Sequence, residues 1–308
     1  MITKAIIPVA GIGSRFLPAS KSIPKEMFPL VDKPVIHYIV KEAVESGIRD
    51  IIFITSAAKK SVEDYFDVNF ELEYRLDKKG KSEFKSAIHE MADWANFYFI
   101  RQSEPLGDGD AILRASGLLG QDQAFAVMWG DDVIISEVPV IKQLIAVYEK
   151  YKSPVFAIEE IHGKAIERYG VINGKEIEPC VYQVSGIIEK PKLEEAPSNL
   201  GIVGHYIITP DVLEALKKQE FDKRGEIGLA YALHDTVKRL PVYGYKFSGA
   251  RYDCGNKLGW LKANVALGLE DYEIGQELGE FLKQETSNFK YQMPNQIQMS
   301  NVKMHGES

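Results

Sequence analysis

The sequence is poor in cysteine and has no long apolar run. It contains two cysteines in 308 residues, Cys180 and Cys254. They could pair, but two free thiols in a reducing cytoplasm are the simpler interpretation. No apolar run approaches the roughly 20 residues that span a bilayer. Pro8 and Gly11 interrupt the apolar stretch at the N-terminus, which argues against a signal peptide. We therefore expect a cytoplasmic protein with no membrane partner.

Excess positive charge and internal repeats are also lacking. The formal net charge is −7, which gives no general support for nucleic-acid binding, although local cations can still hold a small anion. No repeat is visible in the sequence. With 45% apolar and 26% charged residues, the composition is that of a globular protein with one large α/β domain or two small ones.

What the sequence does contain is a short apolar strand that ends in a glycine turn. The strand is expected over residues 5–9, and Gly11-Ile12-Gly13-Ser14-Arg15 follows it closely. Glycines let the backbone approach a ligand, and Arg15 and Lys25 add positive charge. This combination indicates a phosphate site. The alternative is a surface turn with solvated cations, which does not explain why glycines, cations and prolines gather after one strand.

Two familiar phosphate-binding loops are excluded at this position. The dinucleotide fingerprint G-x-G-x-x-G requires a third glycine, but this chain has Phe16 at that position. The fingerprint also requires a helix to begin there, and three prolines within residues 18–29 make a continuous helix unfavourable. The motif G-x-x-x-x-G-K-[ST] is absent because Phe16 and Leu17 stand where Gly-Lys is required. We therefore expect a long extended loop, and we disfavour an NAD-dependent dehydrogenase.

Strands and helices alternate through the first half of the chain. This alternation predicts a mostly parallel, Rossmann-like central sheet flanked by helices, with ligands at the carboxyl ends of the strands. Gly11, Gln102, Gly107 and Asp131 all follow expected strands, so we expect them at one edge of the sheet. The expected strands are residues 5–9, 50–55, 97–101 and 125–128, and the expected helices are residues 34–46, 61–74, 82–94 and a segment ending at Leu119.

The second half has more strands and fewer helices, which predicts a mixed β extension of the sheet. From Thr286 onward the chain is rich in Asn, Gln, Met and Ser, and we interpret it as a tail or as a segment that docks on a neighbouring subunit. The expected strands are residues 154–160, 169–173, 181–189, 201–208 and 242–247, and the expected helices are residues 139–151, 210–218, 226–240 and 257–268.

Asp131 and Asp132 follow an apolar strand directly. Carboxylates in this position suit Mg²⁺, which takes oxygen ligands and binds through one or two carboxylates plus substrate phosphates. For Asp132, a role as a helix or turn cap is an equally good interpretation.

Three motifs together resemble the sugar-1-phosphate nucleotidylyltransferases, and within them most closely the bacterial-type UTP–glucose-1-phosphate uridylyltransferases. The resemblance extends from Ile2 to about Leu269. It implies a nucleotide-diphospho-sugar transferase fold in one domain over 1–285, with a nucleotide-binding half over about 1–135 and a sugar-binding half over about 136–285. It also implies a tail over 286–308 and a homo-oligomer, either a dimer or a tetramer. The motifs are Gly11-Ile12-Gly13-Ser14-Arg15-Phe16-Leu17-Pro18, Pro24-Lys25-Glu26-Met27 and Pro29-Leu30-Val31-Asp32-Lys33-Pro34.

The resemblance also implies roles for individual residues. Asp131 and Asp253 would hold Mg²⁺, and Arg15, Lys25 and Lys190 would act on the phosphates during catalysis. The segment around Asn199 and Gly201 would edge the sugar pocket. Nucleotide binding is implied for Ala10, Gly11, Gly13, Ser14, Glu26, Gln102 and Gly107, and sugar-phosphate binding for Asp132, Gly170, Glu189, Lys190 and Gly204.

Glu189 and Lys190 can serve one substrate only if the strand ends or bends there, because neighbouring residues of a strand point to opposite faces. Pro191 makes such an end plausible.

Two positions depart from the family pattern. Asp110 stands where bacterial members often have histidine, and the run Gly228-Leu229-Ala230-Tyr231 stands where Gln-Leu-Thr-Asp is usual.

The expected reaction is transfer of UMP from UTP to glucose 1-phosphate, which gives UDP-glucose and pyrophosphate. Because the sugar phosphate is already ionised near neutral pH, catalysis would consist of positioning and charge neutralisation. A thymidylyltransferase or a broad-specificity relative stays open within the family. A non-catalytic nucleotide-sugar binding protein is the alternative of another class.

Overall fold

The computed structural model describes residues 1–120 and 123–292. The chain divides into two units, Met1–Ala263 and Asn264–Ser308. The second unit includes the helix α10, Gly275–Gln292. The first residues of the expected 286–308 tail are therefore helical, and the rest of that tail lies outside the described residues.

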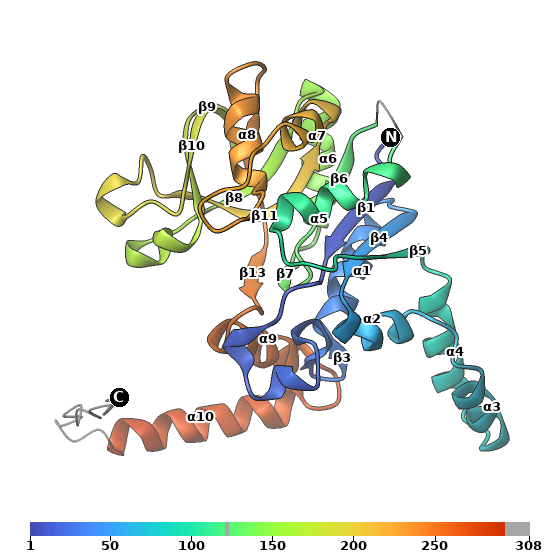
Figure 1. Ribbon diagram of the computed structural model, residues 1–308. Coiled ribbons are helices and arrows are strands. Elements are labelled where there is room, and N and C mark those ends of the chain that lie inside the picture. The colour runs from blue at the N-terminus through green and yellow to red at the C-terminus, as the bar shows by residue number, and fades with distance from the viewer. Residues whose placement is uncertain (121–122, 293–308) are drawn as a thin grey trace, which may run out of the picture. The chain divides into compact units, whose positions relative to one another are not determined.

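A nine-stranded sheet forms the centre of the first unit, in the order β5-β4-β1-β6-β11-β8-β12-β10-β9 (Figure 1). β5, β4, β1 and β6 are mutually parallel, as predicted for the first half. From β11 onward the pairing is antiparallel except between β12 and β8, which confirms the mixed extension. The strands are β1 Lys4–Pro8, β4 Asp50–Thr55, β5 Asn96–Arg101, β6 Phe125–Val127, β8 Val155–Glu160, β9 Gly170–Glu178, β10 Val181–Glu189, β11 Leu200–Ile208 and β12 Tyr243–Lys246.

Helices cover both faces of the sheet. α5, α7 and α8 pack together over one face, and α1 and α6 pack together on the other. The apolar residues of β1, β4 and β6 are buried between these layers because both faces of parallel strands are covered. The helices of the described residues are α1 Val35–Glu45, α2 Lys60–Tyr65, α3 Phe70–Lys78, α4 Ser82–Ala92, α5 Asp108–Arg114, α6 Val140–Tyr151, α7 Pro210–Lys217, α8 Leu229–Val237, α9 Lys257–Glu270 and α10. None of them is long and apolar enough to cross a membrane.

Several expected boundaries were wrong. The single helix expected over 61–74 is two helices, because Asn69 caps α3 by accepting a hydrogen bond from the backbone N–H of Leu72 at 3.0 Å. The helix expected to end at Leu119 ends at Arg114 and continues as a 3₁₀ turn. α8 begins at Leu229 rather than Glu226. β9 continues to Glu178, well beyond the expected Asn173.

Two short strand pairs were not predicted. β2, Pro29–Leu30, pairs with β3, Lys33–Pro34, just after the first loop. β7, Asp132–Ile135, pairs with β13, Ala250–Asp253, and joins segments more than a hundred residues apart in the chain. The second pair matters for function because it places Asp253 beside the Asp131-Asp132 turn.

Candidate active site

The loop after β1 contains three 3₁₀ turns, Ser14–Phe16, Ala19–Lys21 and Lys25–Met27. It is thus more coiled than the extended loop expected from the sequence, but it forms no α-helix, as its prolines indicated. Gly13 has φ 71°, and the Ser20 hydroxyl donates a hydrogen bond to its carbonyl oxygen at 2.8 Å.

An aromatic cluster supports this loop. The rings of Phe16 and Phe28 meet edge to face at 4.9 Å, and both lie within 6.3 Å of the ring of Trp260. The indole N–H of Trp260 donates to the carbonyl oxygen of Pro29 at 3.1 Å. The loop that carries Arg15 and Lys25 is therefore held by two buried phenylalanines packed against a half-buried tryptophan.

Two cavities, each of about 360 Å³, lie at the carboxyl ends of the parallel strands and share Asp131 in their walls. We call them the loop cavity and the hairpin cavity, after the loop following β1 and the β9–β10 hairpin. Asp108, Trp129 and Glu226 also line both. Of the predicted site residues, Ala10, Gly11, Lys25, Glu26, Gln102 and Gly107 line the loop cavity, and Arg15, Asp132, Gly170, Glu189, Lys190 and Asp253 line the hairpin cavity.

Three predicted residues line neither cavity. Gly13 and Ser14 lie within the loop after β1. Gly204 has φ 86°, and a Cβ atom there would lie 2.2 Å from Cδ1 of Trp129. Gly204 therefore makes room for the indole of Trp129. The segment around Asn199 and Gly201 reaches the hairpin cavity through its neighbours Ile202 and Val203.

Asp131 and Asp253 face one another across a glycine. A Cβ atom at Gly255 would lie 2.4 Å from Oδ2 of Asp131 and 3.0 Å from Oδ1 of Asp253. The backbone N–H of Cys254 donates to the Asp131 carbonyl oxygen at 2.8 Å, which ties the two segments together. Among residues 1–120 and 123–292, no group of three or more metal-ligating side chains occurs. A pair of carboxylates beside an open cavity fits Mg²⁺, since that ion takes its remaining ligands from water and phosphate.

Asp132 is buried and has a protein partner. Nε of Arg251 lies 2.6 Å from Oδ1 of Asp132, and Nη1 of the same arginine lies 3.2 Å from Oε2 of Glu159. Burial raises the pKa of Asp132 to about 7, although Arg251 opposes that shift. Its predicted contact with the sugar phosphate stays a prediction.

On the loop side, Lys25 forms an ion pair with Asp131. Burial alone would lower the pKa of Lys25, but the carboxylates of Asp131 and Glu26 raise it above its ordinary value. Glu26 lies 2.7 Å from Nζ of Lys59, and both are almost fully buried. Burial raises the pKa of Glu26, while Lys59 and Lys25 oppose the shift. The loop cavity is therefore backed by a fixed set of charges.

On the hairpin side, β10 ends at Glu189, and Lys190 has φ 48°. This turn confirms that the strand bends there, and it brings Nζ of Lys190 to 2.9 Å from Oε1 of Glu189. A Cβ atom on Gly170 would lie 3.1 Å from the other oxygen of Glu189, so this glycine leaves room for that carboxylate. Both charged groups therefore reach one cavity.

Two backbone segments form the wall where the cavities adjoin. The N–H of Gly109 donates to the carbonyl oxygen of Ile227 at 2.9 Å. The N–H of Ile227 donates to the carbonyl oxygen of Leu106 at 2.8 Å. A Cβ atom on Gly107 would lie 2.4 Å from the Ile227 oxygen, so only glycine allows this approach. The predicted base-recognition segment is thus joined to the segment that departs from the family pattern.

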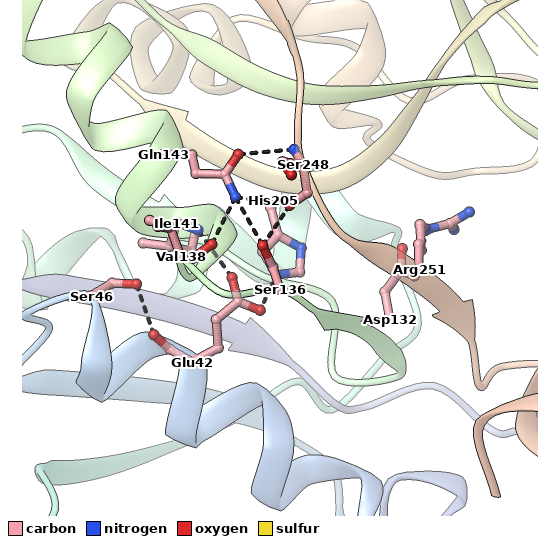
Figure 2. A network of polar contacts seen from close by, with 10 residues as sticks. All are labelled: Glu42, Ser46, Asp132, Ser136, Val138, Ile141, Gln143, His205, Ser248 and Arg251. Atoms are coloured by element: carbon pink, nitrogen blue, oxygen red, sulfur yellow. Dashed lines mark hydrogen bonds and ion pairs between the residues drawn. The ribbon is translucent and has the colours of Figure 1, made fainter. Parts of the chain in front are cut away.

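Figure 2 shows a polar network that the sequence did not indicate. Nε2 of His205 lies 2.9 Å from Oε2 of Glu42, whose other oxygen accepts from the N–H of Ile141 at 3.0 Å. Burial alone would lower the pKa of His205, but Glu42 and Asp132 raise it. His205 has φ 67° and follows Gly204, so the two residues form an irregularity in β11. This irregularity seats Trp129 between the cavities.

Arg251, Asp108, Trp129 and Glu226 are among the residues that line the two cavities but were not predicted from the sequence. Arg251 stands two residues before Asp253 in a strand that alternates its side chains, and Trp129 precedes the Gly130-Asp131 turn. A cation and an aromatic residue next to predicted metal ligands are signals that could have identified them.

Comparison with known proteins now identifies the family. The nucleotidyl transferase family matches residues 4–268. The chain is 43% identical over 282 residues to a UTP–glucose-1-phosphate uridylyltransferase of Bacillus subtilis, covering 92% of this chain and 95% of that protein. It is 44% identical over 283 residues to a protein of the same name in Staphylococcus haemolyticus, covering 92% and 98%.

Solved structures agree with this assignment. A UDP-glucose pyrophosphorylase complexed with UDP-glucose superposes with a TM-score of 0.80 at 40% identity, covering 88% of this chain and 100% of that one. A UTP-bound UGPase from Acinetobacter baumannii superposes with a TM-score of 0.85 at 37% identity, covering 92% and 99%. The protein belongs to the nucleotidyl transferase family and is a nucleotidyltransferase.

Proposed function

We propose that the protein joins glucose 1-phosphate to UTP, giving UDP-glucose and pyrophosphate. The observation that carries this proposal is the position of Asp131, which lies where the two cavities adjoin, with cations on both sides. One cavity would take UTP and the other the sugar phosphate, so that the reacting groups meet beside Asp131. The relatives named as UTP–glucose-1-phosphate uridylyltransferases, and the related structures with UDP-glucose or UTP bound, support the same reaction.

In this reaction an ionised oxygen of the sugar phosphate attacks the α-phosphorus of UTP. A new P–O bond forms as the bond to the bridging oxygen of the β-phosphate breaks, and pyrophosphate leaves with that electron pair. The nucleophile is already ionised, so no general base is required. The enzyme's contribution is to align the two substrates and to balance their charge.

Each charged residue has a proposed task. Lys25 in the loop cavity and Arg15, which lines the hairpin cavity, hold the triphosphate and the departing pyrophosphate, so the triphosphate would extend past Asp131 toward Arg15. Lys190 holds the phosphate of the nucleophile. Glu189 accepts hydrogen bonds from sugar hydroxyls. Asp131 and Asp253 would hold Mg²⁺, which when bound neutralises phosphate charge.

A pyrophosphate-release assay tests this function. UTP, dTTP, CTP and ATP would each be combined with the 1-phosphates of glucose, galactose and N-acetylglucosamine, in the presence of Mg²⁺. We expect UTP with glucose 1-phosphate to have the highest kcat/KM. A higher value for dTTP would favour the thymidylyltransferase. If UTP with glucose 1-phosphate releases no pyrophosphate, the proposed substrate pair is wrong. The homo-oligomeric state and the cytoplasmic location stay predictions.

A further inference from the structure

The amide of Gln102 is held in one orientation. Gln102 follows β5 and is buried at the wall of the loop cavity. Its Nε2 lies 3.0 Å from the carbonyl oxygen of Gly107 and 2.7 Å from Oδ2 of Asp110. A carbonyl oxygen and a carboxylate oxygen only accept hydrogen bonds, so the amide nitrogen must face both. Turning the amide over would place its oxygen against two other oxygens.

The two bonds use both N–H groups of the amide nitrogen. Its oxygen, Oε1, has no hydrogen-bond partner within residues 1–120 and 123–292. Because Gln102 lines the loop cavity, this oxygen is left as an acceptor for a ligand there. The site therefore favours a ligand that presents an N–H donor.

Asp110 has its own support. Nε of Arg114, one turn further along α5, lies 2.8 Å from the same oxygen, Oδ2. The side chain of Asp110 is only 14% exposed, which limits competition from water. Asp110 is thus held from two sides, and the contact that orients the amide of Gln102 is the direct one between its Nε2 and Oδ2 of Asp110.

We propose that Asp110 is a positioning residue that makes the nucleotide site selective for uracil over cytosine. The inference rests on the proposed function, since it assigns the loop cavity to the nucleotide. Uracil presents an N–H donor at ring position 3, which pairs with Oε1 of Gln102. Cytosine has an acceptor nitrogen at that position, which would face the amide oxygen without a hydrogen. Thymine has the same N–H as uracil, so Asp110 does not separate UTP from dTTP.

Three variants test the proposal, with affinity for UTP and for CTP measured by calorimetric titration in the presence of Mg²⁺. Asp110→Leu removes the acceptor while keeping similar volume, and we expect the ratio of UTP affinity to CTP affinity to fall about tenfold. The fall is limited because the Gly107 carbonyl still holds one N–H. Asp110→Asn should keep most of the ratio, since its carbonyl oxygen can accept from both Gln102 and Arg114. Arg114→Gln is the matched control, because it removes the ion pair but leaves the Asp110–Gln102 bond.

The outcomes separate this inference from the proposed function. If the wild type prefers UTP and Asp110→Leu keeps the wild-type ratio, Asp110 does not control base selection. An equal fall in Arg114→Gln and Asp110→Leu would show that loss of the ion pair, rather than of the amide contact, is responsible, and would also overturn the inference. If the wild type binds and turns over no nucleotide, the proposed function itself fails. Asp110→Ala, which suits a helix, replaces the leucine variant if circular dichroism shows that the latter does not fold. The KM for glucose 1-phosphate should stay unchanged in all variants.

Discussion

The cations on the two sides of Asp131 are held in different ways. On the loop side, the side chain of Lys25 is 19% exposed and forms an ion pair with Asp131, behind which Glu26 and Lys59 are almost fully buried. On the hairpin side, Arg251 is buried against Asp132, but the two cations proposed to contact phosphate are not buried: Lys190 is 49% exposed and Arg15 is exposed. Buried charges are positioned before a substrate arrives, whereas exposed ones can adjust to it. We infer that the loop side is preorganised and that the hairpin side adapts to its substrate.

The largest effect is expected where the two sides meet. Asp131→Asn keeps the shape of the side chain but removes its charge, so we expect kcat/KM to fall about 10²- to 10³-fold in ordinary Mg²⁺. Raising the Mg²⁺ concentration should restore part of the activity. Steady-state kinetics over a Mg²⁺ titration measures both effects. Near-normal activity at ordinary Mg²⁺ would show that Asp131 is not a metal ligand.

The buried ion pair between Lys59 and Glu26 allows the preorganisation of the loop side to be tested by a stability measurement. Lys59→Met leaves Glu26 buried without its closest partner, and we expect the free energy of unfolding to fall by about 3–5 kcal/mol. The pKa of Glu26 is already raised in the folded state. Protonation therefore favours folding, and the loss in Lys59→Met should shrink as the pH falls toward 5. Denaturant unfolding at several pH values measures this.

Two controls accompany that measurement. The double change Lys59→Met with Glu26→Leu should recover much of the lost stability, since no unpaired charge stays buried. Lys150→Met breaks the exposed ion pair with Glu178 and should have no measurable effect. Equal loss in Lys59→Met and Lys150→Met would contradict the view that the loop side is held by buried charge.

Arg15 belongs to the exposed group but is proposed to act on the triphosphate. Arg15→Ala should lower kcat about a hundredfold, because a charge-assisted contact to the departing pyrophosphate is lost in the transition state. Pre-steady-state and steady-state kinetics separate the rate from substrate binding. If the variant only weakened the affinity for glucose 1-phosphate, Arg15 would belong to the sugar side instead.

Much of this site was predictable from local sequence. The glycine turn, Gln102 and Asp131 follow short apolar strands, so the rule that ligands bind at the carboxyl ends of parallel strands places them together. Pro191 likewise indicated the bend that brings Lys190 beside Glu189. These features depend on residues close together in the chain.

The remainder depends on pairings that local patterns do not encode. Arg251 reaches Asp132 only because β13 pairs with β7, across 119 residues of chain. The indole of Trp129 packs against the backbone of Gly204, a residue distant from it in the sequence, so local patterns do not indicate the contact. No helix was predicted over residues 275–285, and the polar residues from Thr286 onward suggested a tail, whereas α10 is helical from Gly275 to Gln292.

The smallest of these effects should come from Lys190, and it is the sharpest test of an adaptable hairpin side. If Lys190 holds the phosphate of glucose 1-phosphate, Lys190→Ala should weaken that substrate about tenfold to a hundredfold, since a charge-assisted hydrogen bond contributes roughly 1.5–3 kcal/mol. UTP binding should be almost unchanged, because the proposed contact of Lys190 is with the phosphate of the sugar substrate and not with the triphosphate. Lys190→Arg should rescue in part, as a planar guanidinium replaces a compact ammonium on a half-exposed turn. Calorimetric titration with each substrate decides the matter. Equal weakening of both, or of neither, would mean that Lys190 is a solvated lysine at the end of β10 and that the hairpin side binds its phosphate by other groups.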